Sequence, residues 1–219
     1  MNRPNIRFFL PILFILFGLI LIQCNLYSTI IGNWGETVFN PITPNRLKSM
    51  GTTISVSAGY FLQSYSHTLS ALQLVENSSD GTLDYRKFRK DIRKALEEMN
   101  STVEFYRNFK NYADATPYNE TMIEILKSFD YIGFSESRGL NKVIFSDVKK
   151  FLSNGDVRGA FSKILSNCEK LSSMLESLLK STESGIFPDL NTVWRTNNLF
   201  SDTMVFGQYC AEVFYTISN

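Results

Sequence analysis

The stretch VRGAFSKILSNCEKLSSMLESL, residues 157–178, carries the most regular hydrophobic pattern in the chain. Its apolar residues recur in alternating steps of four and three over three heptads, which places them on one face of an α-helix. They are Val157, Phe161, Ile164, Cys168, Leu171, Leu175 and Leu178. Asp156 is placed to cap this helix at its start, and Gly185 to end it. The pattern predicts a long amphipathic helix with one buried face.

The same helical spacing recurs on both sides of this stretch, interrupted by turn-forming residues. It predicts helices over about 46–75, 83–112, 117–132, 140–152 and 188–217. The third of these is expected to stop at Gly133, and the polar segment 134–139, FSESRG, to be an exposed break. We therefore predict an all-α fold, an antiparallel bundle of about four long helices with one segment broken into two pieces, behind an N-terminal signal or anchor segment.

The N-terminus has the layout of an export signal. Residues 8–22, FFLPILFILFGLILI, contain no charge and follow a short basic segment with Arg3 and Arg7. Fifteen helical residues reach about 22 Å, which is less than the hydrocarbon core of about 30 Å. Continuation to Ile31 would make the segment long enough for an uncleaved membrane anchor. Cleavage and release is another outcome, although no A-x-A-like cleavage site is present.

A further outcome is lipidation. Leu21-Ile22-Gln23-Cys24 resembles the lipobox of bacterial lipoproteins, but it departs from that pattern at Gln23, where a small residue is preferred. The resemblance implies that Cys24 becomes the acylated first residue. The predicted organisation is a signal peptide or anchor at 1–23, a Gly- and Pro-containing tether at 24–45 and a bundle domain at 46–219. The bundle is expected to be extracytoplasmic and held at a membrane.

Charge and cysteine content limit the function classes. The chain has 22 basic and 21 acidic side chains, and this near-neutral balance argues against nucleic-acid binding. If Cys24 is acylated, Cys168 and Cys210 remain as an even pair. They either form one disulfide or stay as two buried free thiols, and the sequence leaves both alternatives open.

The sequence shows no recognisable catalytic or cofactor motif. His67 is the only histidine, which excludes metal sites built from several histidines. No C-x-x-C pair, G-x-S-x-G elbow, phosphate loop or Rossmann glycine pattern occurs. We expect no metal, no cofactor and no enzyme activity, with a mechanism based on carboxylates alone as the remaining enzymatic alternative.

Two groups of side chains have both a functional and a structural interpretation. The run RKFRKDIRK supplies six cations for an anion contact, or alternatively a solvated face paired with acidic neighbours. These cations are Arg86, Lys87, Arg89, Lys90, Arg93 and Lys94. Aromatic residues at helical spacing line a ligand pocket between helices or simply fill the core. They are Tyr65, Tyr106, Phe109, Phe161, Trp194, Phe200 and Phe214.

An export signal followed by a helical bundle without catalytic equipment indicates a protein that acts by binding. The leading hypothesis is a membrane-tethered, extracytoplasmic module, a lipoprotein of the cell envelope, whose partner is another envelope protein. The alternative is a sensory bundle that binds a small molecule between helices near the final one.

Overall fold

The computed structural model describes residues 44–79, 81–115 and 120–218. Within these residues every element of regular structure is an α-helix and none is a strand, so the all-α prediction is confirmed. The helices are α2 (Pro44–Glu76), α3 (Tyr85–Ala115), α4 (Glu120–Ser128), α5 (Tyr131–Arg138), α6 (Lys142–Leu152), α7 (Val157–Glu183) and α8 (Leu190–Ser218).

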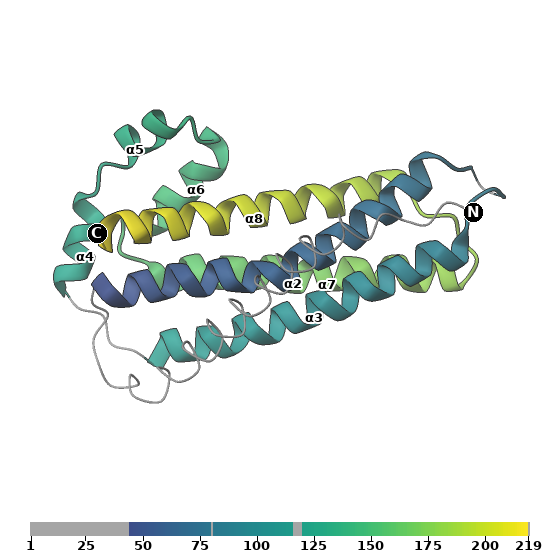
Figure 1. Cartoon of the computed structure of the whole chain (residues 1–219), viewed down its shortest axis with the longest axis horizontal. Coiled ribbons are helices and arrows are strands. Elements are labelled where there is room, and N and C mark those ends of the chain that lie inside the picture. The colour runs from purple at the N-terminus through teal and green to yellow at the C-terminus, as the bar shows by residue number, and fades with distance from the viewer. Residues whose placement is uncertain (1–43, 80, 116–119, 219) are drawn as a thin grey trace, which may run out of the picture. The chain divides into compact units, whose positions relative to one another are not determined.

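The long helices α2, α3, α7 and α8 form an antiparallel bundle (Figure 1). Helix α2 packs against α3 and α8, and α7 packs against the same two helices from the other side of the ring. The turns that join α2 to α3 and α7 to α8 are short, which requires the chain to reverse direction at each of them. After α7, Gly185 adopts the left-handed conformation (φ 76°), which glycine adopts without steric strain.

The periodic stretch at 157–178 forms the inner face of α7, as its spacing predicts. None of its seven periodic residues is more than 3% exposed. At its start, the Gly159 backbone N–H donates to the Asp156 carboxylate over 2.8 Å, which is the expected cap. The Phe161 ring lies 4.7 Å from the Phe109 ring of α3 and 6.4 Å from the Phe214 ring of α8, centroid to centroid. This aromatic cluster joins three helices at the centre of the bundle.

The segment between α3 and α7 differs from the prediction. We expected a break at 134–139, but α5 occupies most of this range, and the break lies one turn earlier, beside Asp130. The Gly133 N–H donates to the Asp130 carboxylate over 3.0 Å, and Gly139 ends α5 with a left-handed φ of 59°. Phe134 is only 8% exposed and stacks on Phe145 with centroids 5.8 Å apart. Polar residues therefore cover the outer face of a short helix, and the segment has three helical pieces instead of two.

We call this segment, α4 to α6, the insert. It lies at the end of the bundle where α2 begins and α8 ends (Figure 1). Helix α6 carries most of its packing against the long helices, through α8 and α7. The insert therefore covers one end of the α7–α8 side of the bundle.

The start of α2 lies two residues before the expected position near Arg46. Its first residue is Pro44, and proline suits the first helical turn because its missing N–H has no partner there. In the described part of the chain no helix is long and apolar enough to cross a bilayer. The apolar run 8–22, Cys24 and most of the predicted tether lie outside the described residues.

Candidate functional site

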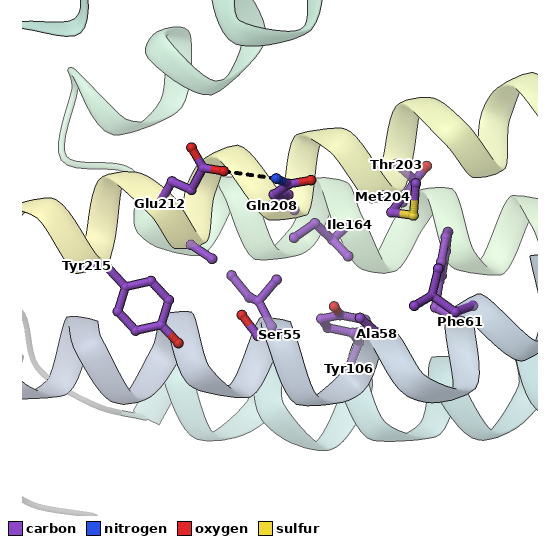
Figure 2. Close-up of a pocket in the computed structure, with 14 residues that line it drawn as sticks. Ser55, Ala58, Phe61, Tyr106, Ile164, Thr203, Met204, Gln208, Glu212 and Tyr215 are labelled. Atoms are coloured by element: carbon purple, nitrogen blue, oxygen red, sulfur yellow. Dashed lines mark hydrogen bonds between the residues drawn. The ribbon is translucent and has the colours of Figure 1, made fainter. Parts of the chain in front are cut away.

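A half-enclosed cleft of about 300 Å³ lies between α2 and α8. Ile54, Ala58 and Phe61 of α2 line one side, and Met204 and Gly207 of α8 line the other. Tyr106 from α3 and Ile164 from α7 close its inner side, so all four long helices contribute to it. In Figure 2, Phe61 and Met204 lie at one end of the cleft and Tyr215 lies at the other.

Small residues lie in the α2–α8 interface at and beside the cleft. At Gly51 the two helices approach closely, since an added Cβ there would lie 3.3 Å from the Ala211 carbonyl oxygen. One turn before Ala211 on α8, a Cβ added to Gly207 would meet Ile54 Cγ2 at 3.4 Å and Ile164 Cδ1 at 3.8 Å, which is ordinary van der Waals contact. Space for at least a methyl group is therefore left empty beside Gly207.

Thr203 lines the cleft and is only 3% exposed, yet its hydroxyl oxygen has no hydrogen-bond partner. Each of the other buried threonines in the described residues donates to the carbonyl four residues earlier, over 2.8 to 2.9 Å. These are Thr68, Thr102, Thr182 and Thr196. A buried hydroxyl without a partner costs about 1–3 kcal/mol. Thr203 is therefore a destabilising exception in an otherwise satisfied set.

The mouth of the cleft is polar but carries no unpaired charge. Gln208 Nε2 donates to Glu212 Oε1 over 2.9 Å (Figure 2), and Arg138 Nη1 of α5 lies 3.1 Å from Glu212 Oε2. The Tyr215 hydroxyl bonds to Thr52 Oγ1 over 3.0 Å. Within the part of the chain that the structure describes, Glu212 is the one carboxylate that lines the cleft, and the Arg138 guanidinium offsets its charge.

Of the two alternatives for Cys168 and Cys210, the structure has two free thiols, and no disulfide joins them. Cys168 on α7 and Cys210 on α8 are each 0% exposed and act as small apolar core residues. Burial, with a smaller effect of the Glu169 charge, raises the pKa of Cys168 to about 12. Burial also raises the pKa of Cys210, against a weaker opposing effect of Lys163. Neither thiol is therefore a ready nucleophile.

The basic run occupies the first turns of α3 and is mostly exposed. Arg93 Nη2 lies 3.3 Å from Glu183 Oε1 of α7, and Arg89 Nε donates to the Tyr85 carbonyl over 3.1 Å. Arg86, Lys87, Lys90 and Lys94 project from the outer surface of the helix. The anion contact at this surface stays a prediction.

His67 lies across the α2–α3 interface from Asp91, with Nδ1 3.9 Å from Oδ1. In the part of the chain that the structure describes, no group of three or more His, Cys, Asp or Glu side chains is arranged to hold a metal ion. A second, wider groove between α3 and α7 is polar, and its side chains bond one another. Arg107 lies 2.7 Å from Glu169 there, and Ser172 bonds to Asn100 over 2.6 Å.

Of the aromatic residues considered for a pocket, Tyr106 lines the cleft, while Phe109, Phe161, Phe200 and Phe214 are fully buried core residues. Sequence reasoning missed Thr203, Gly207 and Ala58. Their only signal in the sequence is small size within otherwise bulky helical stripes, and that signal does not show which helices face each other.

No protein-family model matches this chain, and no curated protein or solved structure shows significant similarity to it.

Proposed function

We propose that this protein acts by binding a small, largely apolar molecule in the cleft between α2 and α8. The observation that carries the proposal is the coincidence of apolar walls with a buried hydroxyl, that of Thr203, that has no partner. The volume of about 300 Å³ is at the lower end of the range for ligand pockets, roughly 300–1,000 Å³. A dry apolar cavity of about 150 Å³ already accommodates benzene.

The free-energy cost of the unfilled cleft favours a ligand site over a simple packing defect. Unfilled space between helices forfeits contacts, and the unpaired hydroxyl costs about 1–3 kcal/mol. Both penalties fall at the same place, and native proteins tolerate such local conflicts mainly where function requires them. A ligand that fills the cleft would recover the lost contacts, and it would also satisfy the hydroxyl once Thr203 rotates that group toward it.

Apart from Thr203, the polar side chains named at the cleft are already engaged, which supports binding over catalysis. Ser55 Oγ donates to the Gly51 carbonyl over 3.0 Å, and the Tyr215 hydroxyl bonds to Thr52. Glu212 is paired with Arg138 and Gln208. Among the described residues that line the cleft there is no nucleophile with an adjacent base and no pair of carboxylates with contrasting environments.

The test is chemical-shift perturbation at the Ile54 and Ile164 methyl groups, which line the cleft from α2 and α7. Indole, menthol and decanol are suitable apolar probes. We expect saturable shifts at both methyls, and we expect Ala58→Leu to abolish them by filling the space. Ser177→Leu, which places the same side chain on the exposed face of α7, is the matched control. Unchanged methyl signals with every probe would contradict the proposal.

We further propose that the bundle is tethered on the extracytoplasmic side of a membrane through its N-terminal segment. Support comes from the basic residues, apolar run and lipobox-like residues that precede the bundle. The intact mass of the protein from native membranes tests this. A chain that begins at acylated Cys24 would identify a lipoprotein, an unmodified full-length chain in the membrane would identify an anchor, and a soluble full-length chain in the cytosol would contradict both.

A protein partner in the envelope is the second candidate function, and exposed apolar side chains on α2 and α8 favour it. Leu62 is 47% exposed, Leu69 37%, Leu190 40% and Trp194 45%. Isolated exposed apolar residues are ordinary, but several on adjacent helices are typical of docking surfaces. Replacing Leu190 and Trp194 by serine should abolish crosslinking to a partner in native membranes without lowering the melting temperature. Persistence of the crosslink would eliminate this surface.

A further inference from the structure

We infer that the α2–α8 cleft selects an uncharged amphiphile, with an apolar body and one neutral hydrogen-bonding group, over fatty anions and amines of the same length. This inference rests on the proposed function and adds the chemical class of the ligand.

The charge distribution around the cleft disfavours a ligand with an ionic head group. Among the described residues, Glu212 is the one acidic or basic side chain that lines the cleft. Arg138 Nη1 lies 3.1 Å from one of its oxygens, and Gln208 donates to the other. A fatty carboxylate would meet no free cation and would lie near the Glu212 charge. An alkylammonium would have to displace Arg138. A charge buried without a partner is strongly disfavoured, so both ionic heads should be rejected.

The walls favour the apolar body. Ile54, Phe61, Ile164 and Met204 present hydrocarbon, a ring and a flexible thioether, and methionine adapts to ligands of irregular shape. Thr203 and Glu212 both line the cleft and are separated by about 13 Å along α8, at 1.5 Å per residue. The cleft is therefore elongated enough for a medium-length alkyl chain.

Thr203 supplies the neutral polar contact after rotation about χ1, because its hydroxyl oxygen is enclosed in the structure and does not face the open cleft (Figure 2). Its hydroxyl is not bonded to the helix backbone, unlike that of every other buried threonine in the described residues. Rotation about χ1 exchanges the methyl and hydroxyl positions, and threonine populates two χ1 rotamers in helices. Since a hydroxyl both donates and accepts, either an alcohol or a carbonyl on the ligand satisfies it.

The experiment compares decanol, decanoate and decylammonium, below the concentrations at which they form micelles, by titration calorimetry on the full chain. Decanol is expected to bind at least tenfold more tightly than either ion. Thr203→Val should weaken decanol binding roughly fivefold to tenfold, the factor contributed by one neutral hydrogen bond. Thr196→Val, which alters a buried hydroxyl on the same helix that is already bonded to the backbone, should leave the affinity unchanged.

A variant that removes the cation beside Glu212 tests the role of charge directly. Arg138→Gln leaves Glu212 without its cation, so decylammonium should gain at least tenfold in affinity while decanol changes little. Arg107→Gln, which breaks an exposed ion pair in the α3–α7 groove, should have no such effect. If an ion binds the unaltered protein as tightly as decanol and Ala58→Leu abolishes that binding, the inference is wrong but the proposed function stands. If none of the three binds and the Ile54 and Ile164 methyl signals do not move, both are wrong.

Discussion

Thr203 and Thr196 lie on the same helix and are both buried, but only the Thr196 hydroxyl is satisfied. The Thr196 hydroxyl donates to the Thr192 carbonyl over 2.8 Å, whereas that of Thr203 has no partner. Valine has nearly the same shape as threonine. The comparison therefore isolates the energetic contribution of one buried hydroxyl at each position.

We predict that Thr203→Val raises the free energy of unfolding by about 1 kcal/mol, because it removes an unsatisfied polar group. Thr196→Val should lower that free energy, by up to about 1 kcal/mol, because it removes a formed hydrogen bond. Urea denaturation followed by circular dichroism measures both. Equal effects of the two substitutions would show that the Thr203 hydroxyl is satisfied in solution.

Two glycines in the α2–α8 interface should respond differently to substitution by alanine. Gly207→Ala should stabilise the protein by up to about 1 kcal/mol, because alanine favours the helix and its Cβ finds ordinary contacts with Ile54 and Ile164. At Gly51 the same Cβ would press against the Ala211 carbonyl at 3.3 Å, which the backbone cannot readily relieve. Gly51→Ala should therefore stabilise less or destabilise. Thermal melts of the two variants decide, and identical increases in melting temperature would refute the close approach at Gly51.

At the scale of elements, the insert is held to the bundle by a small number of specific contacts on α8. The Asn141 backbone N–H donates to the Tyr209 hydroxyl over 2.9 Å, and the Phe145 and Tyr209 rings meet edge to face with centroids 5.9 Å apart. Arg138 pairs with Glu212 one turn farther along α8. The insert is thus connected to the mouth of the cleft through one helix face.

We predict that Tyr209→Phe loosens the insert more than the bundle. The substitution keeps the ring but removes the acceptor for the Asn141 N–H, at a cost of about 1 kcal/mol. Hydrogen exchange in α5 and α6 should become about fivefold faster, while exchange in α3 and α7 should change little. Tyr215→Phe is the control, because its hydroxyl bonds to Thr52 of α2 and not to the insert. Uniform acceleration across all helices would contradict a locally attached insert.

At the scale of the whole molecule, the buried acids make stability depend on alkaline pH. Burial raises the pKa of Cys168 from 9.0 to about 12, and it raises the pKa values of Cys210 and Tyr131 as well. The folded protein keeps these protons at a pH where the unfolded chain has released them. The contribution of the protonated Cys168 thiol to the free energy of unfolding is complete below about pH 9 and is lost as the pH rises toward about 12.

We predict that the free energy of unfolding falls by about 1.4 kcal/mol per pH unit for each buried thiol in this range. Cys168→Ala should make the decline shallower, even though the cavity it creates lowers stability at neutral pH. Ser177→Ala, at an exposed position of the same helix, should leave the slope unchanged. Stability measured at several alkaline pH values tests this, and a slope unaffected by removal of Cys168 would contradict the raised pKa.

The sequence predicted the parts of the fold that depend on local pattern. The inner face of α7, its Asp156 cap and the glycine that follows it were all readable from spacing and residue type. The insert was harder, because Ser135, Glu136 and Arg138 read as a loop, whereas tertiary packing of Tyr131 and Phe134 against Phe129 and Phe145 makes the same residues the outer face of a helix. Short helices depend on such packing more than on their own propensity.

By itself, the sequence determined that long amphipathic helices form and which of their faces are apolar, because periodicity fixes the face that each helix must bury. Only the tertiary structure decided that Gly207 meets Ile54, that Ala58 faces open space and that the Thr203 hydroxyl is unpaired. The physical reason is that a cleft is an absence of atoms between two helices. Its position depends on their relative rotation and translation, which no single helix encodes.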